Sequence, residues 1–140
     1  MRNLVRILTT AAAAVAACAL AVSPATAAGA SSSCDSAGAY GSADWTWVNG
    51  VFIVHVKLTS VDTADDARVA GVQLYTVDRS GHSHEWPWRL NRRGHGSSQT
   101  WETNLQDDRG IDRVGVQAAA FNDAGYRSLC GSGSVRNPYF

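Results

Sequence analysis

An alternation of apolar and polar residues with a period of two is the feature that most constrains how this chain can fold. The alternation is clearest between Val51 and Leu58, and beyond the N-terminal region no stretch repeats with the period of a helix. Successive side chains of a β-strand point to opposite faces, so this run predicts a strand with one buried face. That face would carry Phe52, Val54, Val56 and Leu58. Asn49-Gly50, just before the run, predicts a hairpin turn in which glycine supplies a positive φ.

Further extended segments follow, each bounded by turn-forming residues. Pro87 lies within one of them, and proline cannot donate a hydrogen bond to a sheet ladder, so we expect that segment at a sheet edge or at a bulge. The small-residue segment 113–121 is typical of a central strand. Seven or eight short strands separated by turns predict an all-β fold, an antiparallel β-sandwich. The expected strands cover residues 51–58, 69–77, 82–90, 98–105, 113–121 and 126–131, with another around Trp45 and Trp47.

The N-terminal region has the pattern of a secretory signal peptide. Arg2 and Arg6 give it a positive start, an apolar alanine-rich stretch follows, and Ala25-Thr26-Ala27 matches a cleavage site. A lipoprotein signal ending at Cys18 is an alternative. We expect a secreted, extracellular protein that has no membrane anchor after cleavage. The expected division is a signal peptide at residues 1–27, a flexible leader at 28–33 and a single domain at 34–140.

Two of the three cysteines, Cys34 and Cys130, remain once the signal is removed. In an exported chain they have one intramolecular pairing, which would tie the start of the domain to its end. A redox-active pair would favour close spacing, so we expect a structural disulfide. About 110 residues build only a modest core, and this bond would therefore supply a large share of the net stability.

The charge balance and the absence of catalytic motifs exclude several function classes. The chain has 12 lysines and arginines against 12 acidic residues, whereas a nucleic-acid-binding protein needs a basic surface. No nucleophile elbow or other local catalytic signature is present, and no carboxylate pair is set at a defined separation. We therefore expect no catalytic residues and no cofactor.

The strongest metal-binding pattern is His82-Ser83-His84. Two residues apart on a strand, His82 and His84 would face the same side and could bind one metal ion. No third ligand is set by the spacing, and exposed histidines on a polar edge are the alternative. We therefore do not predict a metal site.

The aromatic residues point to binding or to an unusually aromatic core. The chain has five tryptophans, and Trp86 and Trp88 form an i,i+2 pair that would face one side of its strand. Tryptophan and arginine are enriched at binding hot spots, and Pro87 suggests an edge. We therefore consider Trp86, Trp88 and Arg89 as partner-binding residues, with core packing as the alternative.

The outline of the chain resembles that of small exported actinobacterial proteins. The hairpin expected at residues 114–130 looks like the closing hairpin of an immunoglobulin-like sandwich. Size, export, one bridge and a polar leader together resemble the small immunoglobulin-like adaptor subunit of secreted umbrella toxin particles. That resemblance implies a protein that links a lectin-bearing subunit to the repeats of a large toxin subunit, and it implies no functional positions.

The sequence therefore predicts a non-enzymatic protein-binding module that acts on other secreted proteins as an adaptor. A secreted inhibitor of a hydrolase is one alternative. The small α-amylase inhibitors use a Trp-Arg-Tyr turn, and Trp88-Arg89-Leu90 departs from it at the third position. A small carbohydrate-binding module, with tryptophans stacked on sugar rings, is a second alternative, and a small enzyme is a third.

Overall fold

The structure, a computed structural model, describes residues 27–140 apart from the side chains of Tyr126 and Arg127. All but the last residue of the predicted signal peptide 1–27 lies outside the described residues, as does the alternative lipidation site at Cys18. Among the residues that the structure describes, no helix is long and apolar enough to cross a membrane.

The described chain folds into strands and turns, without a helix. This confirms the predicted all-β fold, and β4, β7, β8 and β9 lie where the sequence placed strands. The strands are β1 (Gly29–Ser36), β2 (Ala39–Trp47), β3 (Phe52–Asp62), β4 (Val69–Val77), β5 (Ser83–Glu85), β6 (Arg89–Asn91), β7 (Ser98–Gln106), β8 (Arg113–Asn122), β9 (Gly125–Gly131) and β10 (Val135–Arg136).

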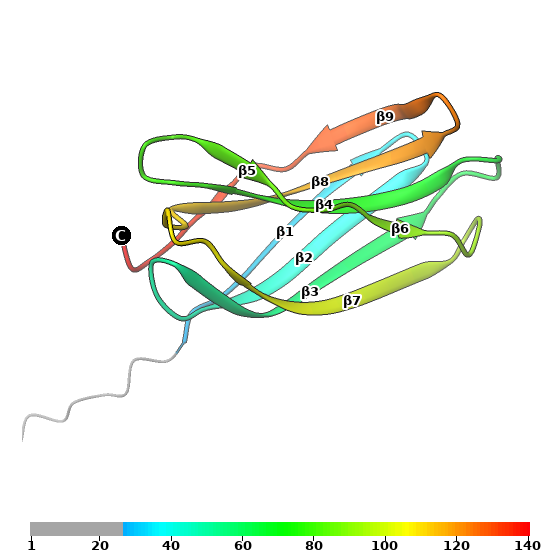
Figure 1. The fold of residues 1–140 in the computed structure, drawn as a ribbon. Coiled ribbons are helices and arrows are strands. Elements are labelled where there is room, and N and C mark those ends of the chain that lie inside the picture. Colours follow the sequence, from blue (N-terminus) through cyan, green and yellow to red (C-terminus); the bar gives the residue numbers. More distant parts are fainter. Residues whose placement is uncertain (1–26) are drawn as a thin grey trace, which may run out of the picture.

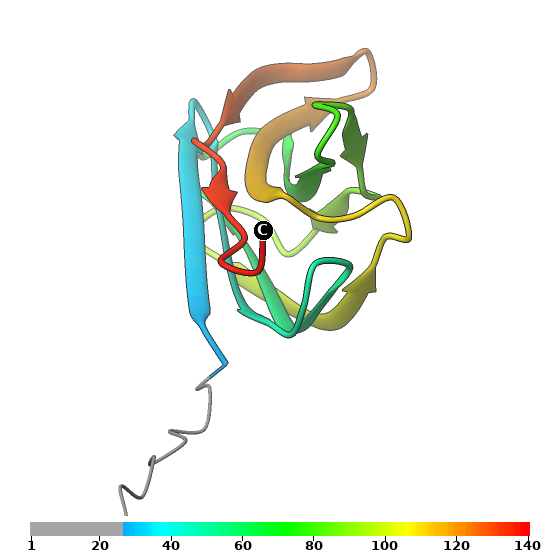
Figure 2. The ribbon, with the colours of Figure 1, turned by 90° about the vertical axis from the view of Figure 1, so that its left-hand side faces the viewer.

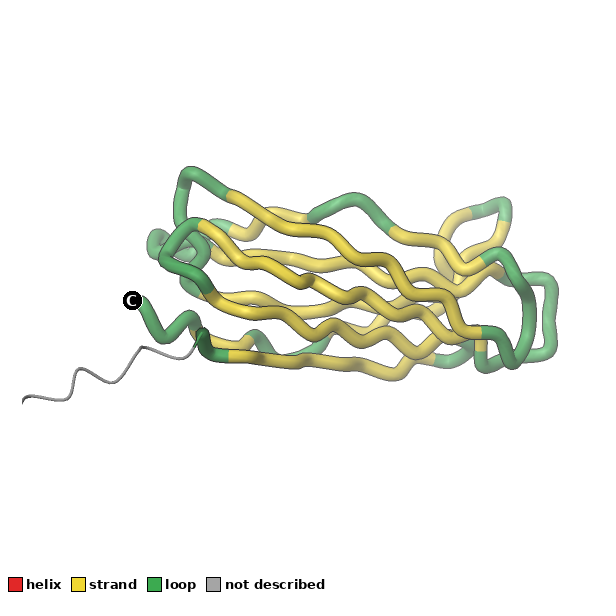
Figure 3. The backbone as a smooth tube through the Cα atoms, turned by 90° about the horizontal axis from the view of Figure 1, so that it is seen from below, coloured by secondary structure: helices red, strands yellow, loops and turns green. Residues whose placement is uncertain are grey.

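These strands form two antiparallel sheets that pack face to face as a sandwich (Figures 1 and 2). Sheet A has the order β1-β2-β3-β7, and sheet B has the order β10-β8-β4-β5, with β9 also paired with β8 and β6 with β4. Because β3 pairs with β7 while β4 pairs with β8, the connections cross between the sheets as in an immunoglobulin-like domain. Most loops lie at the two ends of the strands (Figure 3).

The flexible leader expected at residues 28–33 is wrong, because residues 29–33 belong to strand β1. Its register with β2 is unbroken from Gly29 opposite Thr46 to Ser36 opposite Ala39. Small polar residues are typical of linkers. Here, however, the backbone ladder with β2 pairs the peptide groups, and alternate side chains, beginning with Ala30, turn toward the core.

The single apolar face predicted for residues 52–58 is also wrong, because strand β3 contains a β-bulge. Ile53 pairs with Leu105, but the next paired residue is Val56, which lies opposite Thr103. The extra residue reverses the alternation, so that Ile53 and Val56 are both buried while Phe52 is only half-buried on the other face. His55 adopts the left-handed conformation at the bulge, with φ of 52°.

The hairpin predicted at Asn49-Gly50 is present between β2 and β3, but the glycine has a different role from the one expected. Gly50 does not adopt a positive φ. A Cβ atom at this position would instead lie 2.7 Å from the ring of Phe140. The missing side chain of Gly50 therefore makes room for this aromatic ring and does not serve the turn conformation.

The core lies between the two sheets and changes character along its length. Trp45 and Trp47 are almost fully buried and pack edge to face, with ring centroids 5.7 Å apart. Toward the other end of the strands, Ala39, Ala70 and Ala120 form a separate cluster of small side chains. The main core residues are Ala43, Trp45, Trp47, Ile53, Val56, Leu58, Val72, Leu74, Leu105, Ile111, Val114 and Val116.

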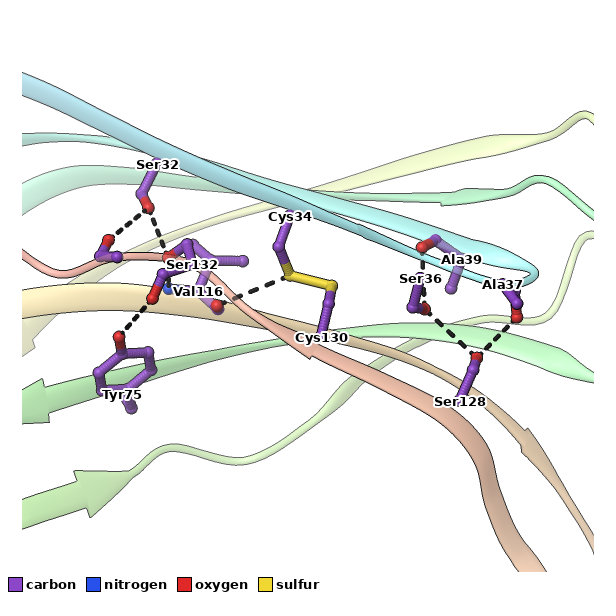
Figure 4. The surroundings of a disulfide bond; sticks show 11 residues. Ser32, Cys34, Ser36, Ala37, Ala39, Tyr75, Val116, Ser128, Cys130 and Ser132 are labelled. Carbon is purple, nitrogen blue, oxygen red and sulfur yellow. Dashed lines mark hydrogen bonds between the residues drawn. A yellow bond between two sulfur atoms is a disulfide. The ribbon is translucent and has the colours of Figure 1, made fainter.

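One side of the sandwich is closed by the predicted Cys34–Cys130 disulfide, which joins β1 to β9 across the two sheets (Figure 4). The Cα atoms of the two cysteines are 5.9 Å apart. On one side of the bridge the hydroxyl of Ser32 lies 2.6 Å from that of Ser132. On the other side the hydroxyl of Ser128 donates to the carbonyl of Ala37 over 2.6 Å.

Candidate functional site

The segment that carries Trp86, Trp88 and Arg89 forms an interrupted edge of sheet B. Glu85 pairs with Tyr75 of β4, and Arg89 pairs with Val72. Three residues of the edge, 86–88, therefore face only two residues of β4, 73–74. Both expectations raised by Pro87, an edge position and a bulge, are confirmed.

The bulge separates the two tryptophans that were expected to share a face. Leu90 pairs with Gly71, and His84 pairs with Thr76, whose side chain is buried between the sheets. With one extra residue between these pairs, Trp86 points to the interior of the sandwich and Trp88 to the outer face of sheet B. The prediction that the pair faces one side is therefore wrong.

Trp86 closes the edge of the core. It packs against the buried cluster, and its indole N–H donates to the Thr76 hydroxyl over 3.2 Å. The His84 ring lies over the indole, with centroids 4.4 Å apart. The side chain of Trp86 is half-buried in this position. It therefore contributes mainly to packing, with one edge left open to solvent.

Trp88 instead lies on the outer face of sheet B, where it meets Phe121 edge to face with centroids 4.9 Å apart. Gly71 makes this arrangement possible. A Cβ atom on Gly71 would lie 2.7 Å from Phe121, 2.9 Å from Leu90 and 3.3 Å from Trp88. The missing side chain lets these three groups lie against the backbone of β4.

A groove of about 440 Å³ opens beside this cluster. Its apolar lining comes from three strands and the tryptophan between β5 and β6, and charged side chains stand at its rim. A continuous apolar patch of this kind on the outer face of a sheet is typical of binding surfaces. The apolar lining includes Val69, Trp88, Leu90 and Phe121, and the charged residues are Arg92 and Asp123.

Arg89 does not join Trp88 in the groove. Its side chain is exposed and lines a smaller cleft, between the two sheets, together with Trp86 and Pro87. The structure therefore brings Trp86 and Arg89 to one surface and Trp88 to another. Sequence reasoning missed Val69, Leu90 and Phe121. These three residues were recognisable in the sequence as apolar residues at alternate strand positions. The sequence does not show that they share one face of the sheet, because that depends on how the strands pair.

The two histidines of the metal-binding hypothesis contact different carboxylates. Nδ1 of His82 lies 3.2 Å from Asp78, whereas Nδ1 of His84 lies 3.0 Å from Asp107. Among the described residues, no group of three or more histidine, cysteine, aspartate or glutamate side chains is placed to hold a metal ion. The arrangement orients the two imidazoles separately instead of bringing them together.

Asp107 forms a clasp between the two sheets at the end of this edge. It lies in the turn that follows β7 and accepts bonds from Arg109 Nε over 3.0 Å and from Arg109 Nη2 over 2.8 Å. These bonds, and then that of His84, hold the pKa of Asp107 well below its usual range, although burial opposes the shift. The clasp thereby fixes strand β5 of sheet B to the end of β7 in sheet A.

Comparisons with protein-family models, with curated proteins and with solved structures found no match for this chain.

Proposed function

We propose that this chain is a secreted, non-enzymatic protein-binding module that acts as an adaptor in an extracellular toxin complex. The single observation that carries the proposal is the apolar groove on the outer face of sheet B. A disulfide that spans the domain and the absence of a membrane-spanning helix in the described residues are consistent with an extracellular protein.

The composition of the groove supports a protein partner. Trp88 is half-buried and packs edge to face on Phe121, and a partner would therefore meet an aromatic side chain whose position is already set by packing. Hot spots are typically such aromatic anchors, surrounded by residues that exclude water. Arg92 and Asp123 at the rim would provide polar contacts and orientation.

The placement of the other tryptophans favours a protein over a polysaccharide. Stacking on successive sugar rings needs a row of exposed aromatic faces. In the described chain, however, Trp45 and Trp47 are core residues, and Trp86 and Trp101 pack against the core. Of the tryptophans in the described chain, this leaves Trp88 for contact with a sugar. Its ring meets that of Phe121 edge to face, so the two rings do not form a flat row of exposed aromatic faces.

The proposal is tested by capture of partners from native culture supernatant with the tagged protein. We expect wild type to recover large secreted partners at a fixed stoichiometry, and Arg92→Glu to recover at least about tenfold less, because reversing a charge that the partner complements leaves like charges opposed in the interface. Arg136→Glu, a charge reversal at an exposed residue of β10 that does not line the groove, is the matched control and should recover as much as wild type. Recovery of the bait alone would contradict the adaptor function.

Two further assays separate the alternatives. Stoichiometric inhibition of a secreted hydrolase, lost in Arg92→Glu, would identify an inhibitor instead. Retention on an insoluble polysaccharide, competed by soluble sugar, would identify a carbohydrate-binding module. An adaptor should do neither.

A further inference from the structure

The two sheets have four edges, and three of them are protected against pairing with another chain. Strand β1 is tied to β9 by the Cys34–Cys130 disulfide, so these two edges cover each other on the same side of the sandwich (Figure 4). The β5–β6 edge is short and is broken at Pro87. Such devices are how native proteins prevent unwanted strand pairing.

Strand β7, the remaining edge of sheet A, is neither tied to another strand by a disulfide nor broken by a proline. It is nine residues long and contains no proline, no glycine and no basic side chain. It pairs with β3 along its length, and no backbone hydrogen bond joins the other side of β7 to any described residue. One side of this strand therefore presents a row of unpaired peptide groups, which is a template for an additional strand.

A small cleft reaches toward the core next to this edge. The cleft, of about 110 Å³, lies between β7 and the β5–β6 segment. Leu58, Leu74 and Leu105 are nearly fully buried core residues, and they nevertheless line this cleft. A strand added to β7 would turn every second side chain toward the sandwich interior, and those beside residues 103–105 would lie over this cleft, next to Trp86 and Arg89.

The position of Glu102 argues against a second copy of this chain as the occupant. Glu102 is at the middle of Ser98–Gln106, and its side chain is 72% exposed. A symmetric antiparallel pairing that uses the whole strand would place Glu102 directly opposite Glu102 of the other copy. Like charges in that position destabilise a sheet, whereas a basic residue there would be favourable.

We propose that the free edge of β7 takes up an extended segment of another protein as a fifth strand of sheet A. The segment alternates apolar residues, which cover the cleft, with polar residues, one of them basic and beside Glu102. This surface is separate from the groove of the proposed function. The inference rests on the proposed function in one respect, because an adaptor needs a second surface for a second partner.

The test uses the isotope-labelled, disulfide-bonded domain and three synthetic peptides as long as β7, nine residues. One peptide alternates valine and lysine, the second has the same composition in two blocks, and the third alternates valine and glutamate. We expect the alternating valine-lysine peptide to shift the amide resonances of β7 and the indole resonances of Trp86 and Trp101. The block peptide should shift none of them, because it cannot place apolar residues on one face.

A pair of variants tests the role of charge. Glu102→Lys should weaken binding of the valine-lysine peptide by about two- to fivefold and strengthen that of the valine-glutamate peptide by a similar factor. Lys57→Glu breaks the same exposed ion pair, in which the two side chains are 3.6 Å apart, but lies one strand away from the edge. This control should bind the valine-lysine peptide as tightly as wild type or more tightly.

Three outcomes would overturn the edge site. One is the absence of any shift in β7 at millimolar peptide, and another is equal binding of the alternating and block peptides. The third is a set of shifts confined to Trp88 and Phe121, which would leave the groove and the proposed function standing. Conversely, peptide binding at β7 together with unchanged partner capture by Arg92→Glu would support the edge and contradict the groove.

Discussion

At the scale of single residues, the surface of sheet B depends on a glycine. Gly71 leaves room for Phe121, Leu90 and Trp88, and each of them would be crowded by a Cβ atom. The same principle operates at Gly115, where a Cβ atom would overlap the ring of Tyr75. The absence of a side chain at these two glycines thus leaves room for aromatic rings. No sequence pattern identifies these rings as neighbours of the glycines.

We predict that Gly71→Ala lowers the free energy of unfolding by about 1–3 kcal/mol, because the added methyl group overpacks the aromatic cluster. Gly131→Ala is the matched control: this glycine also lies in a strand of sheet B, but nothing lies within 4 Å of a Cβ atom there. The free energy of unfolding of the Gly131→Ala variant should differ from that of wild type by less than about 0.5 kcal/mol. Urea unfolding measures the free energy of unfolding of both variants. If the two variants lost the same stability, the crowding at Gly71 would be relieved at no cost.

A second prediction concerns the clasp at Asp107. The pKa of this carboxyl is lowered in the folded state by Arg109 and His84, so its contribution to stability is complete above the unfolded pKa of about 3.9. The contribution is lost as the pH falls below that value toward the folded pKa. Asp107→Asn should therefore be less stable than wild type by about 1–2 kcal/mol at neutral pH, and the difference should shrink below about pH 4.

Urea unfolding at a series of pH values checks this dependence. Asp108→Asn is the control, since the neighbouring carboxylate is exposed and contacts only the side chain of Gln106 among the described residues. It should stay within about 0.5 kcal/mol of wild type at neutral pH. A difference between wild type and Asp107→Asn that is constant with pH would mean that the clasp does not act through its charge.

At the scale of the elements, two bulges decide which residues face the core. The bulge at His55 brings Ile53 into the core in place of Phe52, and the bulge at Pro87 places Trp86 inside and Trp88 outside. One extra residue reverses the side-chain alternation of a strand. An alternation read from the sequence therefore holds only as far as the next bulge.

We predict that His55→Gly keeps or raises the stability, by up to about 1 kcal/mol. His55 has a φ of 52°, a conformation that costs a residue with a Cβ atom about 1–2 kcal/mol and costs glycine almost nothing. Lys57→Gly, two residues further along the same strand, should instead lower the stability by about 0.5–1 kcal/mol. Chemical denaturation of the two variants side by side would refute this interpretation if both lost the same stability.

At the scale of the whole molecule, the two sides of the sandwich differ: one is closed by a disulfide, and the other has an unpaired strand edge beside a small cleft. The disulfide and its flanking serine hydrogen bonds join β1 to β9 and the segment after it, whereas the β7 side has a cleft that reaches core leucines. The groove lies on a third surface, the outer face of sheet B. The two surfaces proposed for binding are therefore separate, so that the proposed adaptor would meet a different partner with each.

The disulfide should supply much of the stability of this small domain. It closes a loop of 96 residues, for which chain entropy predicts about 4–5 kcal/mol. We predict that replacing both cysteines with serine lowers the free energy of unfolding by up to that amount, and that reduced wild type matches the variant. Thermal and urea unfolding provide the measurement. Equal stability of the oxidised and reduced proteins would contradict a stabilising role.

The sequence by itself determined the fold class, most strand positions and the disulfide. Period-two alternation and turn residues are local signals, and the two cysteines that follow the predicted signal peptide leave one pairing. Pro87 likewise predicted an irregular edge from its own covalent chemistry. These properties follow from neighbours in the chain.

Only the tertiary structure decided which surfaces the protein presents. Serine-rich residues 29–36 form a strand because β2 lies beside them, and Trp88 faces outward because the edge has one residue more than β4. The groove joins Val69, Leu90 and Phe121, which are far apart in sequence. Register, bulges and edges arise from pairing between distant segments, and no local pattern specifies them.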